Sequence, residues 1–186
     1  MTVTDPVQEL VVLLDADGIP CGSAPKQDVH HGDTPLHLAF SCYVFDEAGR
    51  VLVTRRALTK AAWPGVWTNS FCGHPMPGES TVDAVRRRGR WELGMEISNL
   101  QQCLPRFSYR AVDANGIVEN EVCPVFTATI AGGLTPRPSE LCEYQWAPLP
   151  DLIAATEAAP WAFSPWLVLQ LPELGQSLTS SLPIPA

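Results

Sequence analysis

Residues 73–94 read GHPMPGESTVDAVRRRGRWELG, and this stretch decides the fold because a loop rich in glycine and proline passes directly into a helical pattern. Ser80 with an acidic residue three positions later resembles a capping box, and Gly94 is a stop signal. We therefore expect a helix that starts at Ser80 and ends before Gly94. Gly89 inside that helix costs about 1 kcal/mol relative to alanine, so close packing of another segment at this position is the expected reason.

The segments on either side mix strands and helices without a regular βαβ alternation, which favours an α+β or mixed-sheet fold over a doubly wound one. Gly49 is expected in the turn of a β-hairpin. The expected strands are 9–15, 36–46, 50–56, 116–130 and 144–149, and the other expected helices are 150–158 and 164–174.

The composition describes a globular protein, with 46% hydrophobic and 17% charged residues in 186. This length suits a single domain over 1–186 with one well-buried core. Many of the 18 prolines fall in connections, so long loops are expected, and residues 173–186 are expected to form a loosely attached tail.

The formal charge of −8 argues against nucleic acid as the main partner. Eleven of the twelve Lys and Arg residues nevertheless fall between Lys26 and Arg110, a distribution that suits the binding of a small anion. The N-terminal segment has neither a basic region nor a long apolar stretch, so no secretory signal and no membrane span are expected. The expected compartment is the cytoplasm, with no membrane partner.

The six cysteines stand far apart without a C-x-x-C pair, so reduced thiols are expected and any functional one acts alone. Cys72 precedes a glycine that allows close approach of another group. It is either a small buried hydrophobic residue or, beside cations or a metal, a thiolate that carries a proton or acts as a nucleophile.

Two glutamates in the segment 116–130 fall on one face of the expected strand, because side chains alternate along a strand. An isolated E-x-E is more often a solvated strand face, but the apolar neighbours of Glu119 and Glu121 indicate an interior strand, where bare carboxylates are costly. With the histidines, these carboxylates are plausible ligands for a divalent ion such as zinc or manganese. The histidines are His30, His31, His37 and His74.

The spacing of residues in 73–94 matches the Nudix box, G-x5-E-x7-R-E-U-x-E-E-x-G-U, in which a loop and a helix carry acidic groups toward a metal bound to a diphosphate. The matching positions are Gly73, Glu79, Arg87, Glu92 and Gly94. Arg88 and Trp91 stand where the box has carboxylates, and Gly89 stands where it has an aliphatic residue. The loss of two carboxylates weakens the case for hydrolysis of a diphosphate.

With HLAF, VTRRAL, WPGVWTNS, CGHP and GIVENEVCPVF in this order, the chain resembles the type I isopentenyl-diphosphate Δ-isomerases of the Nudix superfamily from about residue 10 to 170. The resemblance implies an α+β fold with a Nudix-like mixed β-sheet core flanked by helices. It also implies the reversible conversion of isopentenyl diphosphate to dimethylallyl diphosphate, in isoprenoid biosynthesis. The implied route is protonation to a tertiary carbocation and deprotonation on the opposite face.

The resemblance further implies that Cys72, Glu121 and Tyr109 are catalytic. Glu121 with Tyr109 is expected as the acid toward dimethylallyl diphosphate and Cys72 as the base, and the order stays open. The implied ligands of a divalent ion, manganese, zinc or magnesium, are His30, His37, His74, Glu119 and Glu121. His31 is the neighbouring alternative to His30, which the alignment of the following residues favours.

Other implied positions concern the substrate, a small isoprenoid diphosphate. Glu92 matches the residue that helps to hold magnesium with the diphosphate, and Trp166 matches the tryptophan that covers the hydrocarbon end. The matched diphosphate-binding cations are Lys26, Arg56, Lys60 and Arg88. No flavin is expected, and a monomer is the expected state. The rival hypotheses are a Nudix hydrolase of nucleotide diphosphates and a non-catalytic metal-binding or isoprenoid-sensing module.

Overall fold

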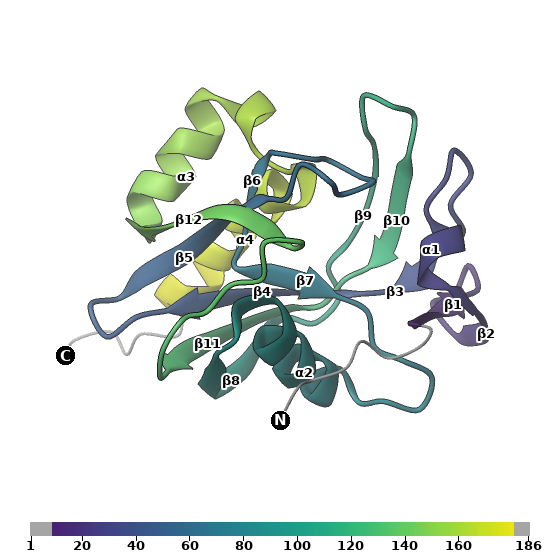
Figure 1. Cartoon of the computed structure of the whole chain (residues 1–186), viewed down its shortest axis with the longest axis horizontal. Coiled ribbons are helices and arrows are strands. Elements are labelled where there is room, and N and C mark those ends of the chain that lie inside the picture. Colours follow the sequence, from purple (N-terminus) through teal and green to yellow (C-terminus); the bar gives the residue numbers. More distant parts are fainter. Residues whose placement is uncertain (1–8, 181–186) are drawn as a thin grey trace.

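Two mixed β-sheets form the centre of the computed structural model, which describes residues 9–180 (Figure 1). The first sheet has the order β2 (Pro20–Pro25), β1 (Leu10–Leu14), β3 (His37–Leu38), β10 (Val118–Val122), β9 (Ser108–Val112). The second has the order β12 (Leu141–Pro148), β5 (Arg50–Arg56), β4 (Phe40–Phe45), β11 (Val125–Ala131), β8 (Glu96–Leu104). Two short strands extend it, with β6 (Trp67–Thr68) paired to β5 and β7 (Phe71–Gly73) paired to β4.

Two neighbouring segments each pass from the first sheet into the second. Strands β3 and β10 pair in parallel in the first sheet, and their continuations β4 and β11 pair in parallel in the second. The single strand expected over 116–130 is therefore wrong: it divides between β10 and β11 at Cys123 and Pro124. Proline has no backbone N–H to give to a strand ladder, which explains the break at this point.

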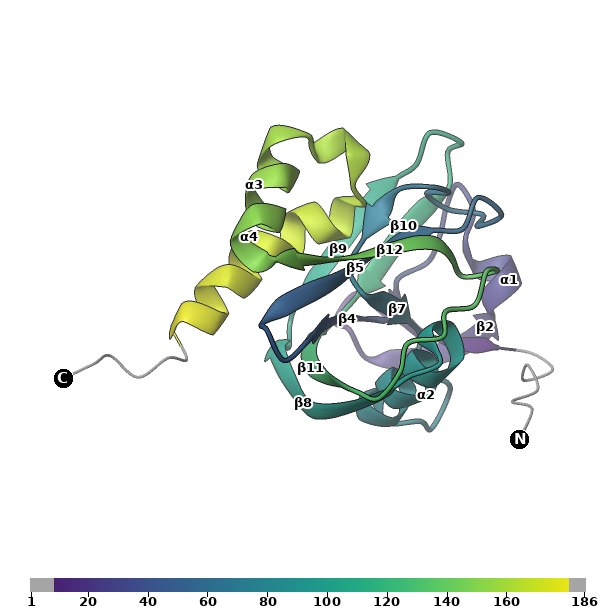
Figure 2. The same cartoon turned by 60° about the vertical axis from the view of Figure 1, so that its left-hand side comes forward.

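Helices cover both faces of the second sheet (Figure 2). The helix α2 (Thr81–Leu93) lies on one face, and α3 (Leu149–Ala158) and α4 (Pro165–Ser180) lie on the other. A short helix, α1 (Lys26–Val29), and a 3-10 turn at Pro160–Ala162 complete the described elements. Successive side chains of β4 enter opposite cores, because Cys42 packs on the α2 side and Tyr43 on the α4 side. The expected α+β fold with helices flanking mixed sheets is confirmed.

The helix expected between Ser80 and Gly94 is confirmed as α2. Ser80 Oγ accepts a hydrogen bond from the backbone N–H of Asp83 at 3.1 Å, and Gly94 ends the helix at φ 60°. A Cβ on Gly89 would lie 3.3 Å from Cζ of Phe71. The glycine therefore lets α2 pack closely against β7, the strand that carries Cys72.

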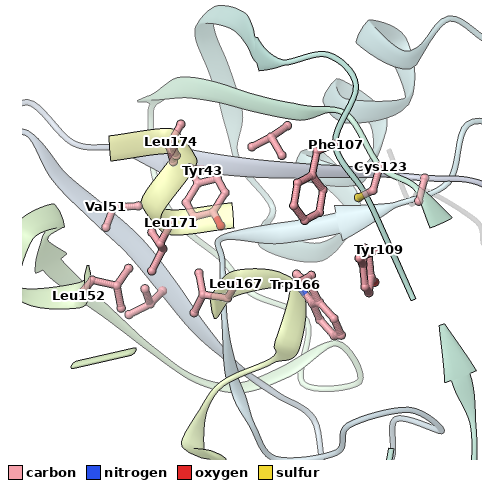
Figure 3. Packing of buried hydrophobic residues seen from close by; sticks show 13 residues of the cluster. Tyr43, Val51, Phe107, Tyr109, Cys123, Leu152, Trp166, Leu167, Leu171 and Leu174 are labelled. Carbon is pink, nitrogen blue, oxygen red and sulfur yellow. The ribbon is translucent and has the colours of Figure 1, made fainter. Parts of the chain in front are cut away.

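The loose tail expected over 173–186 is wrong for its first part, because α4 continues to Ser180. Leu167, Leu171 and Leu174 recur on one face of α4 and are fully buried beside Tyr43 and Val51 (Figure 3). Leu178 packs against the same cluster, so the apolar face continues beyond position 174, where the expected helix ends. Residues 181–186 lie outside the described part of the chain.

Candidate active site

A cavity of about 580 Å³ is lined by residues from both sheets, from α2 and from α4. Its lining includes His30, His74, Glu119 and Glu121, together with Cys72, Tyr109 and Trp166 and with the cations Lys26, Arg56, Lys60 and Arg88. His37 lies beneath it, fully buried. Segments more than 100 residues apart in the sequence thus contribute to one hollow.

Three imidazoles and two carboxylates converge at one end of this cavity. Parallel pairing of β3 and β10 sets Glu121 beside His37, and Nε2 of His37 lies 3.4 Å from Oε1 of Glu121. Nε2 of His74 lies 3.2 Å from the same oxygen. Nε2 of His30 lies 3.3 Å from Oε2 of Glu119. Ligand atoms of the three histidines and Glu121 all lie within 4.8 Å of one another.

This His/Glu cluster could hold a metal ion. Nδ1 of His37 lies 2.9 Å from the carbonyl of Pro35, so its proton donates there and the lone pair of Nε2 faces the carboxylates. Among the described residues, Nε2 of His37 and Nδ1 of His74 are buried without a hydrogen-bond partner. Nitrogen and oxygen ligands of this kind suit a divalent ion. His31 does not belong to the cluster, because its side chain is exposed and its Nδ1 accepts from the backbone N–H of Asp33 at 3.1 Å.

The charges of the cluster are consistent with such a site. Burial raises the pKa of Glu121, but the hydrogen bond and the charge that His37 supplies when it is protonated outweigh burial, and the net pKa is lowered. The same interaction outweighs burial at His37 and raises its pKa. Burial and the charges of His37 and Lys26 hold the pKa of His74 well below its ordinary value. His74 is therefore a neutral imidazole and Glu121 an ionised carboxylate, the forms that bind a metal, and His37 would release its extra proton when an ion binds.

Cys72 lies on β7, half-buried at the cavity wall, and its Sγ donates to Oδ1 of Asn69 at 3.1 Å. Burial raises the pKa of this thiol to about 12. Tyr109 on β9 stands directly opposite Glu121 on β10, and burial followed by the charge of Glu121 raises the pKa of its phenol well above the ordinary value. The thiol and the phenol are therefore protonated beside an ionised carboxylate.

Aromatic rings form the wall next to these groups. Trp166 is 3% exposed, and its Nε1 donates to Oδ1 of Asn69 at 3.0 Å. The ring of Tyr109 lies 5.9 Å from the ring of Trp166, and Figure 3 shows the two side by side. The ring of Trp63 meets Trp166 edge-on at 5.5 Å. Cζ of Arg56 stands 5.3 Å from the centre of the Trp166 ring, and such an arrangement favours positive charge near its face.

The expected cations line the cavity, but carboxylates hold them. Arg88 is 4% exposed and contacts Glu92, Glu9 and Glu140. Lys26 contacts Glu9, and Lys60 contacts Glu140. Arg56 instead donates to the carbonyls of Ala62 and Trp63 at 2.8 and 3.1 Å.

Glu9 and Glu140 are cavity residues that the sequence analysis missed. Burial raises the pKa of each carboxyl, but the neighbouring cations outweigh burial and lower it to about 2. The cations are chiefly Lys26 and Arg88 for Glu9, and Lys60 and Arg88 for Glu140. No motif surrounds either glutamate, and the gathering of cations between Lys26 and Arg110 suggested a small anion rather than carboxylates of the chain, so no signal in the sequence pointed to them.

The other residues of the box brace the loop before α2. Glu79 accepts from Nε and Nη2 of Arg87 at 2.7 and 2.8 Å, and Nη2 also donates to the carbonyl of His74 at 3.0 Å. Trp91, which stands at another acidic position of the box, packs instead against Arg137, whose Cζ is 3.6 Å from the ring centre. Glu92 is therefore the one carboxylate of the box that lines the cavity.

Comparisons with known proteins identify the family of the chain. The NUDIX domain family matches residues 35–167. A protein of Clavibacter michiganensis subsp. michiganensis named isopentenyl-diphosphate Delta-isomerase is 61% identical over 166 residues, 89% of this chain and 86% of that protein. One of Citrobacter koseri with the same name is 58% identical over 162 residues, 87% and 90% of the two chains.

Solved structures support the fold alone. DR0079 from Deinococcus radiodurans superposes with a TM-score of 0.70 at 18% identity, covering 89% of this chain and 99% of that one. A MutT NUDIX hydrolase from Burkholderia pseudomallei gives a TM-score of 0.58 at 23% identity, covering 74% and 97%. By the extent of the family match and the identity to these relatives, the chain belongs to the isopentenyl-diphosphate Delta-isomerases of the NUDIX family.

Proposed function

We propose that the protein is an isopentenyl-diphosphate Delta-isomerase that reversibly converts isopentenyl diphosphate to dimethylallyl diphosphate. The observation that carries the proposal is the sharing of one cavity by Cys72, Tyr109, Glu121 and Trp166, next to the His/Glu cluster and a group of cations. The names of relatives at about 60% identity support the same activity.

The reaction moves a C=C bond by adding a proton to the terminal carbon and removing a proton from the carbon next to the CH2–O group. The alkene has no electron sink, so protonation to a tertiary carbocation is the reasonable route. One group must donate a proton and another must accept one, on opposite faces of a flat substrate. No net proton, electron or water is consumed.

Cys72 and Glu121 suit these two roles because their resting protonation states are complementary. Burial keeps the pKa of Cys72 high, so the thiol carries a proton, while the lowered pKa of Glu121 leaves a carboxylate. Each group then serves as donor in one direction of the reaction and as acceptor in the other. Tyr109, with its raised pKa, stands across the strand pair from Glu121 and can share a proton with that carboxylate.

The bound ions are part of the proposal. His30, His37, His74, Glu119 and Glu121 would hold a divalent ion, manganese, zinc or magnesium, which would neutralise the paired carboxylates and fix Glu121 at the cavity. Glu92 would contact magnesium that arrives with the diphosphate, and Lys26, Arg56, Lys60 and Arg88 would bind the diphosphate itself. No helix in the described part of the chain is long and apolar enough to cross a membrane. The expected monomer and the expected cytoplasmic location stay proposals.

Trp166 would protect the carbocation. The face of an aromatic ring stabilises a positive charge by about 0.5–2 kcal/mol, and more where water is excluded. Trp166 is almost completely buried, with Tyr109 and Trp63 packed around it, and this aromatic wall would help to keep water from the cation.

Hydrolysis of a nucleotide diphosphate is disfavoured at this site. Arg88 takes the place of a carboxylate of the box, and Glu79 is held by Arg87 and does not line the cavity. A non-catalytic binding module is disfavoured because a donor, an acceptor and an aromatic wall are all assembled in one cavity.

The test is to incubate the purified protein with isopentenyl diphosphate and magnesium and to follow product by NMR. We expect dimethylallyl diphosphate from the wild type and almost none from Cys72→Ala or Glu121→Gln. Cys21→Ala and Glu47→Gln remove a thiol and a carboxylate from exposed positions and should retain full activity. Release of phosphate without isomerisation would favour the hydrolase, and full activity of Cys72→Ala would remove that thiol from the mechanism.

A further inference from the structure

A buried chain of hydrogen bonds leads from α4 to the sulfur of Cys72. The hydroxyl of Tyr43 donates to Oε1 of Gln170 at 2.9 Å, and Nε2 of Gln170 donates to Oγ of Ser41 at 3.0 Å. Oγ of Ser41 lies 3.4 Å from Sγ of Cys72. Tyr43, Gln170 and Ser41 are each 0% exposed, so water does not replace any of these bonds.

Donor and acceptor capacities give the chain a direction. Gln170 is the one hydrogen-bond acceptor that the described structure offers to the hydroxyl of Tyr43, which places Oε1 on that side and the amide N–H on the side of Ser41. Ser41 therefore accepts from Gln170, and its own hydrogen is left to donate to a sulfur. Two sulfurs lie at the same distance of 3.4 Å, those of Cys72 and Cys123.

Asn69 contacts Cys72 with the opposite polarity. Its Nδ2 donates to the carbonyls of Cys42 and Phe71 at 3.0 and 2.7 Å, which fixes Oδ1 toward the cavity wall. Oδ1 accepts from the thiol of Cys72 at 3.1 Å and from Nε1 of Trp166 at 3.0 Å. The sulfur thus has an acceptor on one side and the hydroxyl of Ser41 on the other.

We propose that Ser41, oriented by Gln170 and Tyr43, is a positioning residue for Cys72. Its hydroxyl contacts the sulfur from one side and the carboxamide oxygen of Asn69 contacts it from the other, so that the two together fix the place of the sulfur in the cavity wall. This role rests on the proposed function, and it gives α4 a second contribution besides Trp166.

The test combines kinetics with the S–H stretching band of Cys72, isolated as the infrared difference between wild type and Cys72→Ala. In Ser41→Ala we expect kcat to fall by about 10- to 100-fold, because a displacement of a reacting group by about 1 Å can cost about 100-fold in rate. KM for isopentenyl diphosphate should stay within about twofold, because the diphosphate contacts lie elsewhere. The S–H band should shift to higher frequency, because the thiol loses its polarising neighbour.

Tyr43→Phe removes only the remote hydroxyl and keeps the ring, so it remains informative if Ser41→Ala does not fold. We expect kcat to fall by about threefold or more, and the S–H band to shift less in the same direction. Thr127→Val is the matched control, because it deletes another buried hydroxyl next to a sulfur, that of Cys103 at 3.3 Å, and should leave kcat and the band unchanged.

Unchanged kcat and an unchanged band in both Ser41→Ala and Tyr43→Phe would overturn the proposed role. A fall in kcat matched by Thr127→Val would also overturn it, because any buried hydroxyl would then have the same effect. A wild type that shows no isomerisation, but whose S–H band shifts in Ser41→Ala, would instead refute the proposed function and leave the hydrogen-bond chain intact.

Discussion

The Arg88→Met substitution removes a buried guanidinium from the middle of three carboxylates. Removal of one partner from a buried ion pair costs about 3–5 kcal/mol, because the other charge is left without compensation. Lys26 still contacts Glu9, and Lys60 still contacts Glu140. Glu92, 8% exposed, loses the one cation that the described structure places beside it.

The expected loss is therefore at the lower end of this range, about 3 kcal/mol. For a chain of this size such a loss lowers Tm by about 6–12 °C. Differential scanning calorimetry and urea unfolding would measure it. The matched control is Arg90→Met, two positions along the same helix, where the ion pair with Glu96 is 2.6 Å long but its side chains are 53% and 61% exposed. An exposed pair contributes about 0–1 kcal/mol, so Arg90→Met should lose no more than that.

A double substitution separates uncompensated charge from lost packing. Replacing both members of a buried pair by apolar residues is often neutral, so Arg88→Met with Glu92→Met should recover most of the loss. The reasoning would be refuted if Arg88→Met were no less stable than Arg90→Met. It would also be refuted if the double variant were less stable than Arg88→Met alone.

Two further predictions concern acid and metal. The pKa values of Glu9 and Glu140 are lowered from 4.5 to about 2, so their ion pairs stabilise the fold fully above pH 4.5 and the stabilisation is lost as the pH falls toward 2. Glu140→Gln should be less stable at pH 7 and lose less stability between pH 4.5 and 2, as followed by urea midpoints, and an unchanged slope would contradict this cause. Manganese or zinc should raise the Tm of the wild type by several degrees and a chelator should reverse it, because a ligand that binds only the folded state stabilises it. His37→Gln should abolish most of this rise, and an equal rise in both proteins would place the ion elsewhere.

The sequence predicted correctly those elements whose ends are set by neighbouring residues in the chain. The cap at Ser80 and the glycine at Gly94 fixed the two ends of α2. The hairpin turn predicted at Gly49 is confirmed, because β4 pairs antiparallel with β5 and Gly49 has a φ of 74°, which glycine adopts readily. Packing decided the elements that were predicted wrongly. Pro124 divides one apolar run between two sheets, and the buried face of α4 continues a helix into the segment expected as a tail.

Most residues of the candidate site came from family resemblance, because their motifs are local in the sequence. Glu9 and Glu140 have no motif, and their relation to the cations exists only after folding. Ser41 and Gln170 lie 129 residues apart and read as ordinary polar positions of a strand and a helix. No pattern in the sequence marks a hydrogen bond between them.

The sequence by itself determined the residue types that can carry proton transfer and metal binding, and the α+β class, because side-chain chemistry and periodicity are properties of the chain. The tertiary structure alone decided which carboxylates balance the buried cations and which hydroxyl reaches the sulfur of Cys72, and it placed His30, which the alignment favoured, in the cluster. Those outcomes depend on distances of 3–4 Å between distant segments. Hydrogen bonds and buried ion pairs change steeply with distance, so only the packed arrangement sets them.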